Sequence, residues 1–195
     1  AIAVRFAENG ASIVINARTP GPALEVVEHV RAMGREAHFE PADLYNYDDV
    51  KRMVDSAVQR FGHIDILVAC GAAAGPPPQP FHEIDPKLYG DCISSHLFTR
   101  LYSVRAVLDH MMARQSGKII IVTTDAGRTP TRGESLIGGA AAAVVLMTKA
   151  LAMELARSKI RINTICTTVT RDTPGYETAT SQQDTHLANM FKTVS

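Results

Sequence analysis

Three side chains in the middle of the sequence carry groups that can move protons or hold an anion. His96 offers an imidazole, Asp125 a carboxylate and Arg128 a guanidinium, which together could act as acid, base and anion clamp in a non-redox step. The sequence shows no nucleophile or metal-binding cluster beside them. The alternative is structural, because a helix histidine next to Leu97 and Phe98 is usually a packing residue, and charged loop residues are usually exposed.

The cysteines and histidines do not have the spacing of metal ligands. Cys70, Cys92 and Cys166 form an odd, widely separated set without a CxxC pair. The seven histidines contain neither an HxxxH nor an HExxH pattern. We therefore expect reduced, mostly buried thiols, as in a cytoplasmic protein, and no metal site.

Length and composition are typical of one soluble domain over residues 1–195. Apolar residues make up 46%, charged residues 21%, and the formal net charge is zero. This balance gives no electrostatic reason to expect nucleic acid or an anionic membrane as a partner. No run approaches roughly 18 consecutive apolar residues, and the first residues lack a signal-peptide pattern. We expect a cytoplasmic protein without a membrane span.

Short apolar strands alternate with helical stretches along the chain. Apolar periodicity predicts helices over residues 1–10, 21–34, 48–61, 86–114 and 137–156. Strands are predicted over residues 11–18, 36–44, 63–70, 117–124 and 159–167. Residues 71–80 must form a loop, and the tail after Thr167 has at most a short helix near its end. This alternation predicts right-handed βαβ crossovers and a doubly wound parallel sheet with helices on both faces.

Five phrases of the sequence resemble the short-chain dehydrogenase/reductase family, and together they cover essentially the whole chain. In order they are ENGASIVINAR, PADLYNYDDV, RFGHIDILV, GKIIIVTT and MTKALAMELARSKIRINTI. The resemblance implies a Rossmann-like α/β sheet. In this family a first strand and a glycine-rich phosphate-binding turn would stand before Ala1, and a last strand after Ser195. The sequence as given lacks both strands.

The resemblance also implies that the positions holding a dinucleotide are altered. The family's Asn-Asn-Ala-Gly motif reads Ala69-Cys70-Gly71-Ala72, and its Pro-Gly motif reads Thr167-Thr168. Ala17 stands where an acidic residue binds the ribose. Arg18 would suit a 2′-phosphate and Asp43 matches the residue near the adenine, but a solvated arginine and a turn-forming aspartate fit equally well. We therefore expect no cofactor-binding residues in this chain.

The family's hydride transfer needs a tyrosine, a lysine, a serine and an asparagine. Counting from Gly127, the serine position is Thr124, the tyrosine position is Ile137 and the lysine position is Ala141. The asparagine position is His96. Isoleucine cannot exchange a proton and alanine cannot lower a pKa, and we expect no acid beside the threonine hydroxyl. The resemblance therefore implies a chain without catalytic residues.

The predicted helix over residues 137–156 is apolar on more sides than one sheet can cover. In the resembled family this helix and the one over residues 86–114 pack against their copies in a neighbouring subunit. We expect a non-catalytic subunit that pairs through both helices with a competent paralogue, which would carry the NAD. One alternative is an enzyme with altered chemistry at His96, Asp125 and Arg128. A dinucleotide sensor is the other, and it would still need the phosphate-binding turn.

Overall fold

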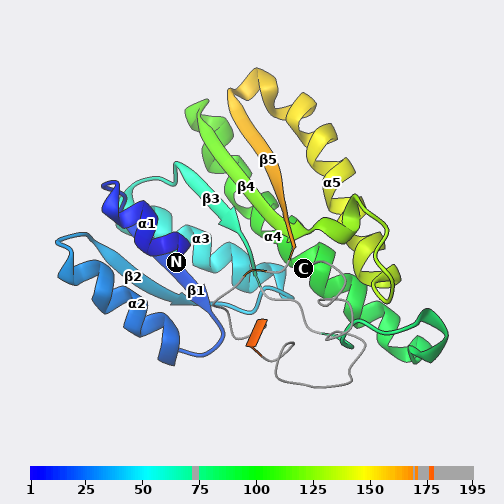
Figure 1. The fold of residues 1–195 in the computed structure, drawn as a ribbon. Helices are drawn as coiled ribbons and strands as arrows, with labels where there is room; N and C mark the ends of the chain where they lie inside the picture. Colours follow the sequence, from blue (N-terminus) through cyan, green and yellow to red (C-terminus); the bar gives the residue numbers. More distant parts are fainter. Residues whose placement is uncertain (72–74, 169, 171–175, 178–195) are drawn as a thin grey trace.

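The computed structural model describes residues 1–71, 75–168, 170, 176 and 177 (Figure 1). Helices and strands alternate as predicted. The helices are α1 (Ile2–Glu8), α2 (Gly21–Ala32), α3 (Tyr47–Phe61), α4 (Tyr89–Arg114) and α5 (Ser135–Leu155). The strands are β1 (Ile13–Ala17), β2 (Ala37–Pro41), β3 (Ile66–Ala69), β4 (Gly117–Thr124) and β5 (Ile160–Thr167). The short helix predicted near the end of the tail lies outside the described residues.

Local residue chemistry explains where the helices begin and end. α3 begins at Asn46, whose side chain accepts hydrogen bonds from the backbone N–H groups of Asp48 and Asp49, and it ends at Gly62 with φ of 79°. α4 begins later than predicted, because Pro86–Leu88 forms a separate 3₁₀ turn capped by the Asp85 side chain. The ends of α3 thus follow from capping residues, and the late start of α4 follows from the turn that Asp85 and Pro86 begin.

All strand pairs are parallel, which confirms the predicted fold class. The strands form two ladders, however: β1 pairs with β2, and β3 pairs with β4, which pairs with β5. In Figure 1 the strands follow one another in the order β2, β1, β3, β4, β5. The two ladders stay separate because no described strand lies between β1 and β3.

Helices cover both faces of the strands. α1 and α2 pack on one face of β1 and β2, where Ala7, Val27, Val30 and Ala37 form a small buried cluster joined by Phe39. Side chains alternate along β2, so the neighbouring Glu40 points to the opposite face, where it accepts a hydrogen bond from Ser56 of α3. A larger cluster lies between α3, α4, α5 and the strands β3 to β5. The core therefore has two parts.

We expected no segment apolar enough to span a membrane, but the stretch that contains α5 is long and apolar enough by composition. Among the described residues, the stretch Ser135–Ser158 passes that test by length and composition. Thr148, Lys149 and Glu154 break the apolar run without lowering its average hydropathy enough to exclude it. Sheet-covering helices pass the same test, and α5 packs on β5 and α4. Only 28% of its apolar window is buried, so much of its apolar surface is exposed.

Candidate functional site

Two of the family's catalytic positions, Thr124 and Ala141, lie close together at the carboxyl end of β4. Thr124 is the last residue of β4, and the 3₁₀ turn Asp125–Gly127 that follows it packs against the first turns of α5. A Cβ atom on Gly127 would lie 2.7 Å from the carbonyl carbon of Ala141, so only glycine permits this approach. The contact places residue 141 next to the end of β4, as the family spacing implies.

The tyrosine and lysine positions hold apolar side chains in this structure. Ile137 is half-buried, and Ala141 is fully buried at 0% exposure. Neither side chain has a proton to exchange or a charge to place near a hydroxyl group. The described residues at these two positions therefore cannot supply the acid–base step of hydride transfer.

The expectation that no acid stands beside Thr124 is wrong. Its hydroxyl oxygen accepts a hydrogen bond from the backbone N–H of Ala126 at 3.2 Å and donates one to Oε2 of Glu134 at 3.5 Å. Burial raises the pKa of the Glu134 carboxyl above its ordinary value, an effect that the Thr124 hydrogen bond partly opposes. Glu134 was missed because it lies ten residues after Thr124, and only the reversal of the intervening loop brings the two together. One signal in the sequence could have indicated Glu134. It is an acidic residue that stands close before a helix, and neither residue next to it is basic.

His96 lies half-buried on α4 beside the buried Arg100, which was not among the predicted site residues. Burial, with a smaller contribution from the Arg100 charge, lowers the pKa of His96 to about 4. Arg100 is only 6% exposed and donates hydrogen bonds to the backbone carbonyls of Val122, Ser95 and His96. The imidazole is therefore neutral near pH 7, and Arg100 ties α4 to β4. An arginine within the apolar face of a long helix was the signal for it.

Asp125 and Arg128 bind each other. The Nε atom of Arg128 lies 3.6 Å from Oδ1 of Asp125, on an exposed arginine and a half-buried aspartate. Within the described part of the chain, no hydrogen bond or ion pair joins either residue to His96. The structure thus does not assemble these three predicted residues into one acid–base site.

The residues that resemble cofactor contacts are mostly exposed. Asp43 accepts a hydrogen bond from the backbone N–H of Tyr45 at 3.0 Å, which is the turn-forming role. Arg18 is exposed beside the half-buried Ala17. Cys70 is also exposed and Cys166 half-buried, so the expectation of mostly buried thiols is wrong, and only Cys92 is buried. Cys70 directly follows β3 and Cys166 lies on the edge strand β5, where less structure covers them.

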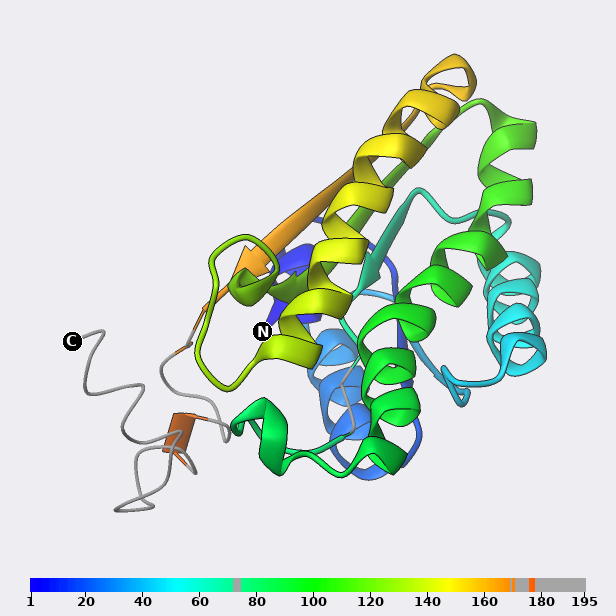
Figure 2. The same cartoon turned by 90° about the vertical axis from the view of Figure 1, so that its right-hand side faces the viewer.

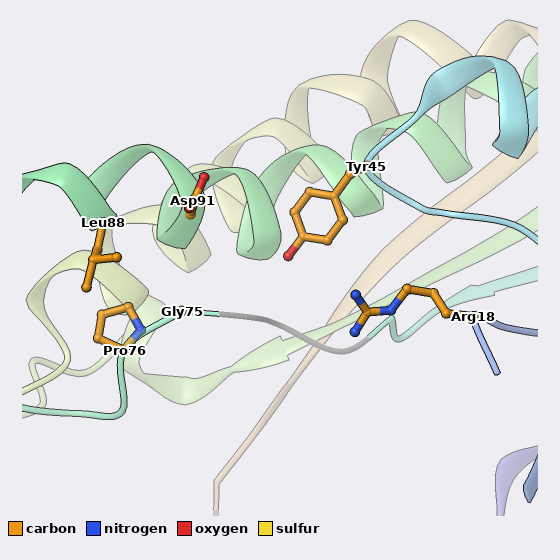
Figure 3. A pocket seen from close by; sticks show the side chains of 6 residues that line it. All are labelled: Arg18, Tyr45, Gly75, Pro76, Leu88 and Asp91. Carbon is orange, nitrogen blue, oxygen red and sulfur yellow. The ribbon is translucent and has the colours of Figure 1, made fainter.

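A cavity of about 550 Å³ opens at the carboxyl ends of β1 and β2 and the start of α4 (Figure 3). Figure 3 shows the Arg18 guanidinium and the Tyr45 hydroxyl reaching into it from one end, with Pro76 and Leu88 at the other. Doubly wound sheets bind ligands at such a position. The cavity lining offers Arg18 as its one cation, and the described residues form no glycine-rich turn for a pyrophosphate. These residues therefore do not fit a complete dinucleotide site, and the described part of the chain also holds no group of three metal-binding side chains.

The sequence matches the family model for short chain dehydrogenase over residues 1–184, so the chain belongs to the short-chain dehydrogenase/reductase family. A cis-4-hydroxycyclohexanecarboxylate dehydrogenase from Sinomonas cyclohexanicum is 32% identical over 88% of this chain and 65% of its own length. A 3-oxoacyl-[acyl-carrier-protein] reductase from Staphylococcus epidermidis is 29% identical over 84% of this chain and 67% of its own length.

Solved structures support the same fold. NAD⁺-bound xylitol dehydrogenase superposes with a TM-score of 0.80 at 25% identity, covering 84% of this chain and 63% of that one. Carveol dehydrogenase from Mycobacterium avium, in complex with NAD, gives 0.79 at 26% identity over 84% of this chain and 64% of that one. The chain spans 62 to 65% of the length of three of the curated relatives that it matches.

Proposed function

We propose that this chain is a non-catalytic subunit of a hetero-oligomeric short-chain alcohol dehydrogenase in the cytoplasm. The observation that carries the proposal is the pair of apolar side chains, Ile137 and Ala141, at the two positions where the family needs a tyrosine and a lysine. The relatives named above are called dehydrogenases or reductases, so a chain of this family without those groups would act beside a competent subunit. That partner would bind the NAD.

The exposed surface of α5 supports such a pairing. An apolar stripe runs along it with Leu146 at 70% and Met153 at 81% exposure, and its other members are Gly139, Ala142 and Ala150. Exposed apolar patches of this kind mark protein interfaces, and small residues let two helices approach closely. α4 adds the exposed side chains of Ile93, Phe98 and Met112. Figure 2 shows α4 and α5 facing the same side, so residues 86–114 and 137–156 would form the contact.

The reaction we propose for the complex is NAD-dependent oxidation of a β-hydroxyacyl-CoA, such as 2-[hydroxy(phenyl)methyl]succinyl-CoA, on the partner subunit. The chain resembles the inactive subunit of the dehydrogenase for that thioester in anaerobic toluene degradation. The name of one relative agrees with the chemical class, since it refers to a 3-oxoacyl group. In this chain itself we propose no catalytic, cofactor or metal residue.

Native mass spectrometry of the complex purified through a tag on this chain, followed by an NAD titration, tests the proposal. We expect a stoichiometric second short-chain subunit that accounts for all the bound NAD. A homo-oligomer that oxidises an alcohol with NAD on its own would overturn it.

The second candidate is an enzyme of the same fold with altered, non-redox chemistry. It was predicted at His96, Asp125 and Arg128, and the observation that now favours it is the Thr124–Glu134 pair, whose carboxyl has a raised pKa. A carboxyl whose pKa is raised keeps its proton to higher pH and can serve as a general acid. The test is hydration of an enoyl-CoA by the purified chain without dinucleotide, with Glu134→Gln beside the parent. If the parent hydrates the substrate and Glu134→Gln does not, the result supports this candidate. If the parent shows no hydration, the result contradicts it.

A further inference from the structure

A second cavity, which we call the edge cavity, lies beside the start of β2 and the helix α3. Its volume is about 340 Å³, and its lining consists of Glu36, Ser56, Gln59 and Arg60. Gln59 and Arg60 follow Ser56 by three and four residues on α3, so the three share one side of the helix. Glu36 directly precedes β2, which puts the cavity at the amino end of that strand. Doubly wound folds bind their ligands at the carboxyl ends of the strands, so the edge cavity is separate from the family's site.

Ser56 presents a hydrogen-bond acceptor to the edge cavity. Its hydroxyl donates to Oε1 of Glu40 at 2.5 Å, and Nε2 of His38 lies 3.0 Å from the same oxygen. The hydroxyl proton is therefore used, and the lone pairs of its oxygen remain for a donor in the cavity. The Glu40 side chain is only 16% exposed, and a hydrogen bond to such a carboxylate strengthens the hydroxyl as an acceptor. The Ser56 oxygen is thus suited to a cationic N–H group.

Two opposite charges line the edge cavity without contacting each other. Glu36 and Arg60 both lie on its wall, yet no ion pair joins them. Within the described part of the chain, no hydrogen bond or ion pair engages the side chains of Glu36, Gln59 or Arg60. Elsewhere on α3 a charged pair does form, since Nη1 of Arg52 lies 2.7 Å from Oδ1 of Asp49. The carboxylate and the guanidinium of the cavity are therefore available to a ligand that lies between them.

The lining of the edge cavity defines the chemical class of its ligand. A carboxylate and a hydroxyl oxygen accept hydrogen bonds from an ammonium group, whereas a guanidinium and an amide N–H donate them to a carboxylate. All four lining side chains are polar, so they offer no apolar contact. The volume of 340 Å³ is near the lower end of small-molecule sites, which span roughly 300 to 1,000 Å³. These properties fit a small zwitterion.

We propose that the edge cavity binds a free α-amino acid with a small polar side chain, such as serine. Glu36 and the hydroxyl oxygen of Ser56 accept hydrogen bonds from its ammonium group, and Arg60 and Gln59 donate hydrogen bonds to its carboxylate. Glu40 and His38 hold the Ser56 hydroxyl in place from below. The inference rests on the cavity and its charges, and it does not depend on the proposed subunit role.

Titration of the 195-residue chain with L-serine, followed by amide chemical shifts, measures the binding and locates the ligand. Two analogues each remove one charge: ethanolamine lacks the carboxylate, and 3-hydroxypropionate lacks the ammonium group. We expect serine to shift the amides of Ser56, Gln59 and Arg60 with a Kd below roughly 1 mM. Each analogue should bind at least roughly tenfold more weakly, because it loses one charge-assisted contact.

Two substitutions separate the contacts to the two charges of the ligand. Arg60→Gln should weaken serine at least roughly tenfold without weakening ethanolamine, whereas Glu36→Gln should weaken serine without weakening 3-hydroxypropionate. Both side chains are exposed, so neither variant should unfold. Arg52→Gln, on the same helix but outside the cavity lining, is the matched control and should bind serine as the parent does.

Three results would overturn the proposal. The first is the absence of shifts at these amides with roughly 10 mM serine, or shifts confined to the cavity of Arg18 and Tyr45. The second is ethanolamine binding as tightly as serine, which would mean a general cation site. The third is serine binding that Arg60→Gln leaves unchanged. None of these results bears on the NAD-carrying partner, which native mass spectrometry detects independently.

Discussion

At the residue scale, the site contains hydrogen-bonding groups but not the tyrosine and lysine that handle the proton of the substrate hydroxyl in this family. Thr124 still presents a hydroxyl at the end of β4, held by the N–H of Ala126. Glu134 adds a carboxyl that the family pattern does not require. What the positions of Ile137 and Ala141 lack is an acid whose pKa a neighbouring cation could lower. Within the described residues, Thr124 and Glu134 can bind a ligand or exchange a proton, and Ile137 and Ala141 supply no acid for the family's redox step.

Restoring the two family residues should not restore that step. We expect the Ile137→Tyr, Ala141→Lys double variant to reduce no NAD with any alcohol, because Ala69, Cys70 and Thr167 stand where the family's cofactor motifs have asparagine and proline. Ala141 is fully buried against Gly127, so the lysine should also destabilise the fold by about 1 to 3 kcal/mol. NADH absorbance and urea unfolding measure both effects. Ile137→Phe is the matched control for ring size, and turnover by the double variant would refute this account of the cofactor site.

The buried His96 should make stability depend on pH with a defined sign. Its pKa is about 4 in the folded chain against an ordinary 6.5, so the unfolded chain takes up the proton first as the pH falls. The corresponding stability is complete above about pH 6.5 and is lost as the pH falls toward 4. We expect His96→Asn to lose less stability than the parent over this interval, measured by urea midpoints. His82→Asn, at an exposed histidine, is the control, and parallel curves for His96→Asn and the parent would contradict the prediction.

The contribution of Glu134 to stability should depend on pH in the opposite direction to that of His96. Its folded pKa is raised above the ordinary 4.5, so its contribution is present at lower pH and is lost as the pH rises through the raised value. We expect Glu134→Gln to gain stability relative to the parent as the pH increases from 4.5, because the amide never ionises. The same urea series measures this difference. A difference that does not change with pH would mean that the carboxyl is not desolvated.

At the element scale, sequence pattern predicted those features that depend on neighbouring residues. The apolar run from Gly117 to Thr124 gave the bounds of β4, and the helix predicted over residues 48–61 matches α3 (Tyr47–Phe61) to within one residue. The Thr124–Glu134 contact could not be predicted in this way, since it depends on how a ten-residue loop reverses. The separation of the strands into two ladders likewise depends on which strands are neighbours in space. Neighbouring residues thus determine which helices and strands form, whereas contacts between distant residues determine which strands pair.

The exposed stripe of α5 gives the sharpest test of the proposed pairing. Leu146→Glu should leave the monomer within about 0.5 kcal/mol of the parent, because this side chain is 70% exposed, but it should release the partner subunit. Val145 is half-buried, so a charge there would disturb folding and assembly together. Native mass spectrometry and thermal unfolding separate the two effects. Leu24→Glu, at an exposed leucine of α2, is the matched control, and an unchanged mass for Leu146→Glu would refute the interface.

At the scale of the whole molecule, the divided core implies that the fold does not open as one unit. The cluster around Val30 holds α1, α2, β1 and β2 together, and the cluster around Val107 holds the rest. Cooperativity between two such parts depends on the apolar contacts that cross between them. Leu44, which directly follows the segment of β2, packs on the larger cluster.

Matched valine truncations measure this cooperativity. Val30 is 0% and Val107 1% exposed, so each change to alanine should cost on the order of 1 to 3 kcal/mol in its own cluster. We expect Val30→Ala to speed amide exchange in β1 and β2 roughly tenfold or more while β4 and β5 keep their protection, because the smaller part can open alone. Val107→Ala should speed exchange in β3, β4 and β5. If Val30→Ala instead lowered protection equally in all five strands, the two clusters would unfold as one, and the gap between β1 and β3 would already be bridged by packing.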